Sequence, residues 1–371
     1  MVERTFLIEP RDAVIFRDGK PFSAGLSSRS VGWPMPSAVI GAIRTRLGLE
    51  TGFSGDIPDR LREIEHQGPF LALPHPGGGW QLAFPAPADA VTFDDPTDKD
   101  RIEIHPLRPR EFAPGEGSDL DDRLRLLFGG REGKPSARAL AFWTAAFTLE
   151  WLSRQDTQPL RRRPDDIGVA ALKRQRRMHV AIEPGSQTAR DEMLFATEGL
   201  EFEQSDGNKR LFSQGICSRI RYPERPWATP DRAAPLGGER RLAHWSETEI
   251  PWPERPAWGG GPRLRMQLLT PGAFAAGWKP GWIGEDLYGT PPTAPGLKMK
   301  LVAAAVPRAI PVSGWDYVER HPKPTRFLAP AGSVYFFDEL ADDPASLWMS
   351  SICDQPQDRL DGFGLVLYGG W

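Results

Sequence analysis

The last eleven residues contain the feature that most limits how this chain can fold. A short apolar run, Leu365 to Tyr368, lies between Gly362-Phe363-Gly364 and Gly369-Gly370. A run this short between glycines is typical of a buried strand and is too short for a helix. Glycines also let backbone N–H groups come close to an anion, because no Cβ stands in the way. The sequence therefore predicts a sheet that is completed by this strand, with a glycine-rich rim beside it.

Similar β-type runs occur throughout the chain, and few helical patterns separate them. Strands are predicted at 5–8, 14–16, 70–73, 80–84, 178–182, 193–195, 263–270, 297–306 and 332–337. Helices are predicted at 36–47, with Pro36 in the first turn and Ser37 as the cap, at 136–154 and at 344–352. Glycine and proline, 38 residues each, exceed their usual combined share of about 12%. The chain is therefore expected to be an α+β protein with long loops.

The length of 371 residues and the 40% hydrophobic content allow two domains, each with a core. Strands occur in both halves, which indicates two βαββαβ modules, although no repeat is visible residue by residue. We place the N-terminal module at 1–160, with an irregular insertion at about 85–135, and the C-terminal module at 161–371.

Charge and cysteine content exclude several classes of protein. The net charge of −3 gives no overall attraction to nucleic acid, so any basic surface must be local. Cys217 and Cys353 form no metal or disulfide framework, which fits a reducing cytoplasm. No signal peptide and no uncharged apolar run of eighteen residues are visible, so we expect a cytoplasmic chain without a membrane span.

The strongest charge cluster lies between Leu160 and Arg177. Its cations are Arg161, Arg162, Arg163, Lys173, Arg174, Arg176 and Arg177, against Asp165 and Asp166. Such a cluster is either a phosphate-contacting strip or a solvated linker between domains. The predicted strand and hairpin that follow, beginning at Met178-His179, favour the first interpretation, because sheet-based modules present cations beside a nucleic-acid path.

Motifs for catalysis are missing. The six histidines are scattered, and none has a metal-type partner three or four residues away. No phosphate loop, zinc-protease motif, nucleophile elbow or dinucleotide fingerprint is found. His179 alone could act as a general base in RNA cleavage, but a contact or core role is favoured. The sequence predicts binding without catalysis, and neither a metal nor a cofactor.

Several motifs in order resemble one known family. They are Glu9-Pro10-Arg11-Asp12, Phe16 to Phe22, Pro36 to Arg44, His179 to Ile182, Gly277-Trp278-Lys279-Pro280, Gly314-Trp315-Asp316, Pro322-Lys323-Pro324, Pro330 to Phe336 and the terminal Gly362-Phe363-Gly364. The chain resembles the third subunit of the Cmr complex, the type III-B CRISPR effector, within the RAMP superfamily. It departs from the family pattern at Ala38, Glu192 and Arg240.

The resemblance implies a non-catalytic subunit with two ferredoxin-like, RRM-like modules. Such a subunit would bind the 5′ handle of the guide RNA (crRNA) and bridge the large polymerase-like subunit to the backbone of RAMP subunits. The expected RNA-binding residues are Arg29, Ser37, Arg44, Lys173, Arg174, Arg176, Arg177, His179, Arg240, Gly362, Phe363 and Gly364.

Three alternatives remain open. The first is the type III-A counterpart, which the N-terminal signature disfavours. The second is a guide-processing endoribonuclease of the same superfamily, with His179 or His244 as the acid or base. The third is a structural scaffold that makes no RNA contact.

Overall fold

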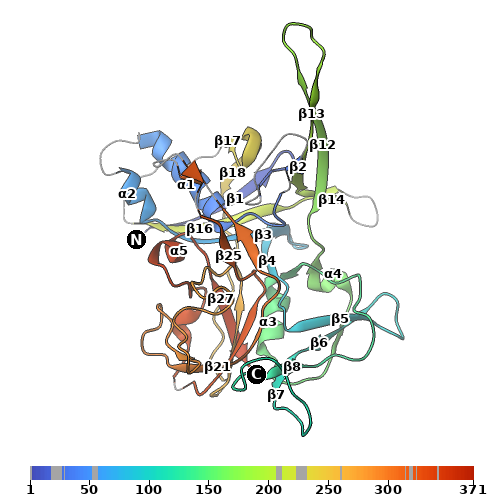
Figure 1. The fold of residues 1–371 in the computed structure, drawn as a ribbon, viewed down its shortest axis with the longest axis vertical. Helices are drawn as coiled ribbons and strands as arrows, with labels where there is room; N and C mark the ends of the chain where they lie inside the picture. The colour runs from blue at the N-terminus through green and yellow to red at the C-terminus, as the bar shows by residue number, and fades with distance from the viewer. Residues whose placement is uncertain are drawn as a thin grey trace. The chain divides into compact units, whose positions relative to one another are not determined.

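The computed structural model describes residues 2–17, 27–28, 30–51, 57–205, 211–222, 232–259, 261–313, 315–316, 321–322, 324–340 and 342–371. It is an α+β structure with mostly antiparallel sheets and few helices, as the sequence predicts (Figure 1). The chain forms two compact units. The first contains residues 1–79, 172–249 and 311–327, and the second contains 80–171, 250–310 and 328–371.

These units do not follow the predicted division near residue 160. Each unit takes segments from both sides of that position, and the chain passes between them several times. The prediction assumed that neighbours in sequence share a module, whereas strand pairing joins distant segments here. The short strands β22 (Ile310–Val312) and β25 (Arg326–Leu328) lie where the chain passes between the units.

The first unit is built on an antiparallel sheet. Its strands are β1 (Val2–Pro10), β3 (Glu65–Pro74), β16 (Gly215–Tyr222), β17 (Arg232–Pro235) and β18 (Leu242–Glu247). They lie in the order β3-β16-β1-β18-β17, and each neighbouring pair is antiparallel. The predicted strands at 5–8 and 70–73 are thus confirmed.

Helix α1 (Pro36–Thr51) supplies much of the core of the first unit. Val39, Ile40, Ile43 and Leu47 are at most 2% exposed and pack with the apolar side chains of β1 and β16. Full burial of such a side chain contributes about 1.5–3 kcal/mol each. The helix begins at Pro36, so the predicted capping role of Ser37 is wrong. The shorter helix α2 (Ile57–Arg62) follows.

A long hairpin, β12 (Lys173–Ile182) and β13 (Ala189–Glu201), also belongs to the first unit (Figure 1). Near its base, β13 pairs in parallel with β2 (Ser27–Ser28). The remaining short elements of this unit are β14 (Glu203–Ser205), β15 (Leu211–Ser213), β23 (Trp315–Asp316), β24 (His321–Pro322) and the 3-10 turn η1 (Gly238–Arg240).

The main sheet of the second unit has the same strand order. Its strands are β19 (Leu264–Leu268), β20 (Tyr288–Gly289), β21 (Met299–Ala305), β26 (Val334–Asp338) and β27 (Val366–Gly370), in the order β20-β21-β26-β19-β27. If the long strands are counted along the chain, they lie in the order second, third, first, fourth. The strands β1, β3, β16 and β18 of the first unit follow the same order. The terminal strand is therefore confirmed as part of this sheet.

Helix α3 (Ala145–Ser153) is shorter than the predicted helix at 136–154. The apolar residues before it form β9 (Phe142–Thr144), which pairs with β4 (Trp80–Pro85) and β11 (Gly168–Val169). Thr144 ends the strand and caps the helix, since its Oγ1 accepts a hydrogen bond from the Phe147 N–H at 3.3 Å. The helix prediction was wrong at its N-terminal half because strand pairing recruited those residues.

The segment 85–135 is not irregular, contrary to prediction. It contains β5 (Ala90–Asp94) and β6 (Ile102–Pro106), which form a small sheet with β10 (Leu160–Arg162), and the pair β7 (Arg108–Arg110) and β8 (Leu126–Phe128). Short strands among Pro, Asp and Gly residues lack the length that makes a β pattern visible in sequence.

A buried charge cluster fixes the end of α3 onto β19. Asp89 accepts hydrogen bonds from Arg265 at 2.7 Å, from Arg108 at 3.1 Å and from the Trp151 indole N–H at 2.9 Å. Arg265 is fully buried and also donates to the Trp151 and Arg154 carbonyls at the C-terminal end of α3. Burial lowers the pKa of Arg265 and lowers that of Arg108 to about 10. The guanidinium of Arg265, on β19, thus caps the C-terminal end of α3 by donating to its free carbonyls.

The remaining elements of the second unit are short. They are α4 (Pro164–Ile167), the 3-10 turn η2 (Ala345–Leu347) and α5 (Pro356–Leu360). The helix predicted at 344–352 is reduced to that single turn. Among the described helices, none is both long enough and apolar enough to cross a membrane.

Candidate nucleic-acid interface

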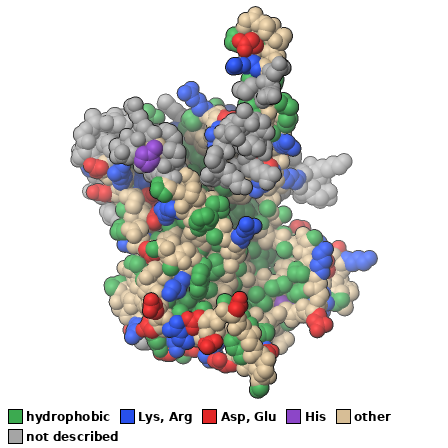
Figure 2. Space-filling view, in the orientation of Figure 1, with side chains coloured by type: hydrophobic (Ala, Val, Ile, Leu, Met, Phe, Trp, Pro, Cys, Tyr) green, Lys and Arg blue, Asp and Glu red, His purple; other side chains and the backbone are tan. Residues whose placement is uncertain are grey.

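Strand β12 has two faces, because side chains alternate along a strand. One face carries Arg174 and Arg176, followed toward the hairpin tip by the apolar Met178, Val180 and Ile182. All five side chains are exposed. The three apolar ones are 45–56% exposed, as is Leu194, which lies opposite Val180 on β13. We call these six residues the exposed hairpin face. Hydrophobic side chains are visible on the surface of this hairpin in Figure 2.

The opposite face of the hairpin holds His179 in place. Its ring stacks on Phe195, with centroids 5.1 Å apart and an interplanar angle of 13°. Its Nε2 lies 2.8 Å from the Thr197 hydroxyl. The stacked, hydrogen-bonded imidazole links the two strands of the hairpin, and the RNA contact expected of His179 stays a prediction.

Asp12 joins two basic segments of the first unit. Its carboxylate accepts hydrogen bonds from Arg177 of β12 at 2.6 and 3.0 Å and from Arg241 at 2.6 Å. Partial burial acts to raise the pKa of Asp12. Hydrogen bonds from Arg177 and the Ala13 N–H, with the charges of Arg177 and Arg241, outweigh burial and lower that pKa below 3.8. Asp12 therefore brings Arg240, next to Arg241, close to the base of the hairpin.

The cations of this region divide into engaged and exposed ones. Arg174 donates to the Ser30 carbonyl at 3.0 Å and pairs with Glu198 across the hairpin. Lys173, Arg176 and Arg240 are exposed, and none of them contacts a polar partner within the described part of the chain. These three are the cations that a phosphate could approach at no cost to an internal contact.

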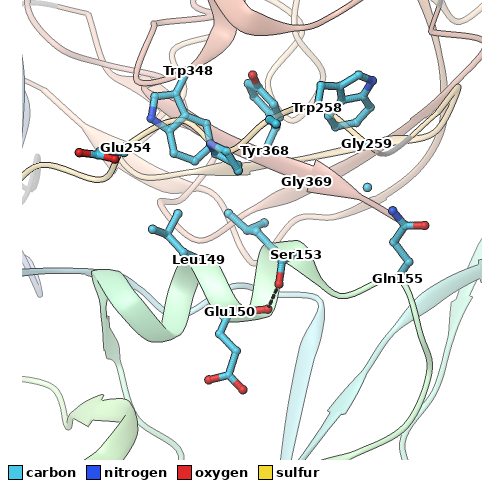
Figure 3. A pocket seen from close by; sticks show the side chains of 14 residues that line it. Leu149, Glu150, Ser153, Gln155, Glu254, Trp258, Gly259, Trp348, Tyr368 and Gly369 are labelled. Atoms are coloured by element: carbon cyan, nitrogen blue, oxygen red, sulfur yellow. Dashed lines mark hydrogen bonds between the residues drawn. The ribbon is translucent and has the colours of Figure 1, made fainter.

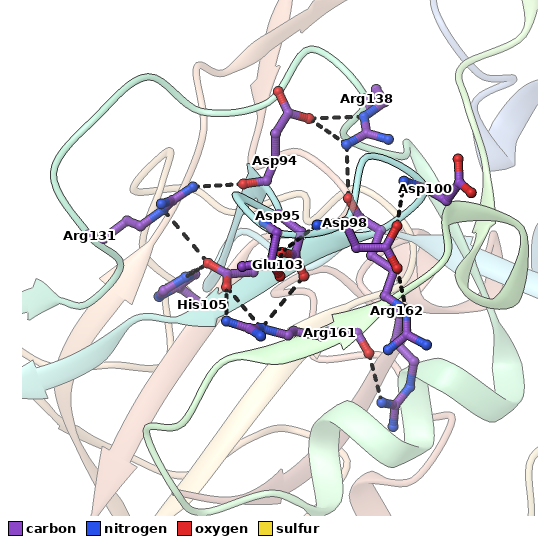
Figure 4. A network of polar contacts seen from close by, with 12 residues as sticks. Asp94, Asp95, Asp98, Asp100, Glu103, His105, Arg131, Arg138, Arg161 and Arg162 are labelled. Carbon is purple, nitrogen blue, oxygen red and sulfur yellow. Dashed lines mark hydrogen bonds and ion pairs between the residues drawn. The ribbon is translucent and has the colours of Figure 1, made fainter.

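The predicted basic cluster at 160–177 is not one strip. Arg161 and Arg162 belong to the second unit, where Arg161 pairs with Glu103 at 2.8 Å and with Asp95 at 3.6 Å (Figure 4). Arg162 pairs with Glu150 of α3 at 2.6 Å. These two arginines tie β10 to β6, to the end of β5 and to α3, whereas Arg163 is exposed in the second unit and only the cations of β12 lie on the hairpin.

The terminal Gly362-Phe363-Gly364 turn is buried, with Phe363 only 4% exposed. Its three N–H groups donate to the carbonyls of Arg359, Asp358 and Pro271. A Cβ on Gly364 would lie 2.5 Å from the Cys353 sulfur, in a backbone conformation with φ of +65°. These glycines serve packing in this structure, which gives no support to the RNA contact predicted for the turn.

The other predicted residues are placed as follows. Ser37 is exposed in the first turn of α1. Arg44 donates to the carbonyls of Arg62 and Ile64, both at 3.2 Å, and thereby ties α1 to the end of α2. Arg29 lies outside the described residues.

The apolar part of the exposed hairpin face and the role of Asp12 are not predicted from the sequence. The alternation of Met178, Val180 and Ile182 with smaller or polar residues is visible in the sequence, but it does not reveal that the apolar side faces solvent. Only the fold shows that no other described element covers it. Within the described residues, no group of three or more His, Cys, Asp or Glu side chains could hold a metal ion.

Comparison with known proteins agrees with the resemblance noted above. The family model for a CRISPR-associated protein (Cas_Cmr3) matches residues 6–371. Two solved structures are similar at 13% sequence identity, each over 90% of this chain and 86% of the other. One is the type III-B Cmr-beta bound to cognate target RNA and AMPPnP, with a TM-score of 0.49. The other is Cmr-beta bound to cognate target RNA, with a TM-score of 0.47.

A search of curated proteins gives no match. The family model, however, spans nearly the whole length of the sequence. The chain therefore belongs to the Cas_Cmr3 family of CRISPR-associated proteins, subunits of type III-B CRISPR complexes.

Proposed function

We propose that this subunit binds the 5′ handle of the guide RNA through the base and the exposed face of the β12–β13 hairpin. The observation that carries the proposal is the sequence of side chains on one strand face: Arg174 and Arg176 at the base, then Met178, Val180 and Ile182 toward the tip. Cations hold phosphates, while apolar side chains pack against unstacked bases. Single-stranded RNA offers both groups side by side.

The strand order supports two ferredoxin-like modules. In each unit, the four long strands lie in the order second, third, first, fourth along the sheet, which is the order of a βαββαβ module. In each unit one of the two crossovers contains an α-helix, α1 between β1 and β3 and α5 between β26 and β27, while the described residues of the other crossover form no α-helix. Sheets of this kind commonly present RNA-binding surfaces.

Salt-dependent RNA binding is the direct test. The purified protein is mixed with labelled handle-bearing RNA and with a scrambled RNA of equal length, at several salt concentrations. We expect tighter binding of the handle. The Arg176→Glu and Arg240→Glu variants should each bind more weakly, with a salt slope reduced by about one per lost phosphate contact. The measurement is fluorescence anisotropy.

The matched control is Arg308→Glu, which reverses an exposed arginine of the second unit and should leave binding unchanged. Arg177→Glu is unsuitable as a first test, because it also removes a partner of Asp12. Equal, negligible binding of both RNAs, with no rescue when the other complex subunits are added, would refute the proposal.

We further propose that the subunit is non-catalytic and bridges the large polymerase-like subunit to the RAMP backbone. His179, one candidate acid or base, is stacked on Phe195 and hydrogen-bonded to Thr197, and it has no carboxylate partner in the described structure. Precursor repeat RNA incubated with the protein alone should remain intact. Cleavage that disappears in His179→Ala or His244→Ala would favour the endoribonuclease alternative.

The bridging role is tested separately. Native mass spectrometry of a complex assembled without this subunit should show the large subunit missing.

A further inference from the structure

The second unit contains a pocket of about 390 Å³ beside the end of β27. Leu149 and Ser153 of α3 lie on one side of it, and Trp258, Tyr368 and Trp348 lie on the other (Figure 3). The position of α3 depends on Gly369, since a Cβ there would lie 1.9 Å from the Leu152 carbonyl oxygen. Gly369 therefore keeps the α3 side of the pocket close to β27.

Three aromatic rings form one wall of the pocket. Trp258 and Trp348 both meet Tyr368 edge-to-face, with centroid distances of 5.7 and 5.2 Å and interplanar angles of 72° and 83°. Tyr368 is buried, and the indole N–H of Trp348 donates to the Pro253 carbonyl at 2.9 Å. Rings held in this way are pre-formed and lose little freedom when a ligand binds.

The charge of the lining is purely negative. Glu150 and Glu254 line the pocket, and no lysine or arginine is found among its described lining residues. Glu150 is paired with Arg162. Glu254 is exposed and has no ion-pair partner among the described residues. The neighbouring Arg255 is held by Asp343 at 3.1 Å and also lies near the Tyr368 hydroxyl, where it partly offsets the rise in the pKa of Tyr368 caused by burial. An unneutralised carboxylate therefore stands beside an aromatic wall.

We propose that this pocket receives a basic side chain, arginine or lysine, from a protein partner. A cation over tryptophan or tyrosine is attracted by the ring face, and the methylene part of the side chain packs on apolar surface. Glu254 supplies the opposite charge, and a guanidinium matches a carboxylate in shape as well as charge. The volume of about 390 Å³ admits a long side chain together with part of the segment that carries it. The inference concerns a protein contact and does not rest on the binding of the guide handle.

The same lining disfavours RNA as the occupant. A nucleobase could stack on Trp258 or Trp348, but its phosphate would be close to carboxylates and would meet no cation in the described lining. Nucleic-acid sites on proteins combine aromatic rings with positive charge, and only the first of these is present. Charge complementarity thus selects a basic protein segment.

Ligand-observed NMR with small probes tests the proposal on the full chain. The probes are N-acetylarginine amide, its neutral analogue N-acetylcitrulline amide, and adenosine monophosphate. We expect saturable binding of the arginine probe in the millimolar range, and binding of the citrulline probe that is weaker by about tenfold or more, as expected when a charged partner is lost.

Two variants and two matched controls locate the binding. Glu254→Gln should weaken binding of the arginine probe severalfold, and Ser153→Phe, which fills the pocket from α3, should abolish it. Ala146→Phe, at an exposed position of the same helix outside the pocket, and Glu285→Gln, at an exposed glutamate elsewhere in the unit, should bind as the wild type does. Circular dichroism checks that each variant is folded. If Ser153→Phe does not fold, Glu254→Gln alone tests whether the arginine probe binds in the pocket.

Four results would overturn the proposal: no binding of the arginine probe, equal binding of arginine and citrulline probes, binding that the pocket variants leave unchanged, or tighter binding of adenosine monophosphate that Ser153→Phe removes. The last result would assign the pocket to a nucleic-acid base. None of these results bears on handle binding by the hairpin, which is measured with different variants.

Discussion

Single residues with several charged partners carry much of the specificity of this fold. Asp12 links Arg177 of the hairpin to Arg241 after η1, so one carboxylate fixes two segments that are far apart in sequence. Asp89 does the same in the second unit for Arg108, Arg265 and the indole of Trp151. The two differ in burial, and this difference decides how much each contributes to stability.

Removal of the Asp12 charge should have a small, pH-dependent effect. Because its side chain is 37% exposed, solvent screens the pairs, and we expect Asp12→Asn to reduce unfolding free energy by no more than about 1 kcal/mol at pH 7. The folded pKa of Asp12 is lowered, so the contribution is complete above the unfolded pKa of about 3.9 and is lost as pH falls through the folded value.

Urea unfolding of the wild type and of Asp12→Asn checks this expectation. The measurements run from about pH 2.5 to about pH 7, a range that spans the ordinary carboxyl pKa. The difference between the two proteins should disappear at the acid end. Glu9→Gln, which has no ion-pair partner in the described structure, is the control and should show no such trend. A difference that grows toward acid pH would contradict the assignment.

The Asp89 cluster should be far more sensitive to substitution. Asp89→Asn leaves two buried guanidiniums without a counter-charge, and the loss of one partner of a buried pair costs about 3–5 kcal/mol. Chemical denaturation measures it. The exposed pair of Arg110 and Glu116 supplies the comparison, since Glu116→Gln should change the midpoint little. Equal midpoints for Asp89→Asn and the wild type would show that the cluster is not a stability determinant.

Among the secondary-structure elements of the second unit, α3 and β27 approach each other very closely. A Cβ on Gly369 would lie 1.9 Å from the Leu152 carbonyl oxygen, so Gly369→Ala must push the helix away from the sheet. We expect a loss of about 1–3 kcal/mol or more in unfolding free energy. Gly296→Ala is the matched control, because nothing lies within 4 Å of a Cβ at that position. Thermal unfolding of both variants distinguishes a steric cause from a general effect of alanine.

Element prediction succeeded where the pattern was long and local. Apolar runs, together with the Gly, Pro and polar residues that bound them, predict helix α1 and strands β1, β12, β19, β21, β26 and β27. It was wrong in the N-terminal half of 136–154, where the apolar residues Phe142 and Trp143 satisfy a helix pattern but pair with β4 instead, whereas α3 forms in the second half. The candidate site was predicted in part: the cations of β12 were identified, whereas the exposure of Met178 and Val180 depends on which face the rest of the unit covers.

The two units of the molecule interleave in sequence, which leads to a prediction about fragments. A chain of residues 1–160 would lack β16 and β18 from the first sheet and β19, β21, β26 and β27 from the second. We expect this fragment to show no cooperative unfolding transition, in contrast to the full chain. Differential scanning calorimetry provides the measurement. A sharp transition in the fragment would restore the division near residue 160 that the sequence predicts.

The repeated strand order could not be read from the sequence, because no residues repeat with it. The two units share the spatial order of their four long strands. The lengths, connecting loops and side chains of these strands differ between the units. Backbone pairing and apolar burial permit many sequences for one topology. This explains how the class of fold could be predicted while the segments that compose each unit could not.

The interleaving also has a consequence during synthesis. β19, the central partner of β26 and β27, emerges from the ribosome well before either of those strands has been made, and β21 lacks its partner on one side until β26 follows. The apolar strand edges of the incomplete sheet then stay exposed while tens of further residues are translated. We therefore expect nascent chains to be prone to aggregation until β27 has been made and can complete the sheet.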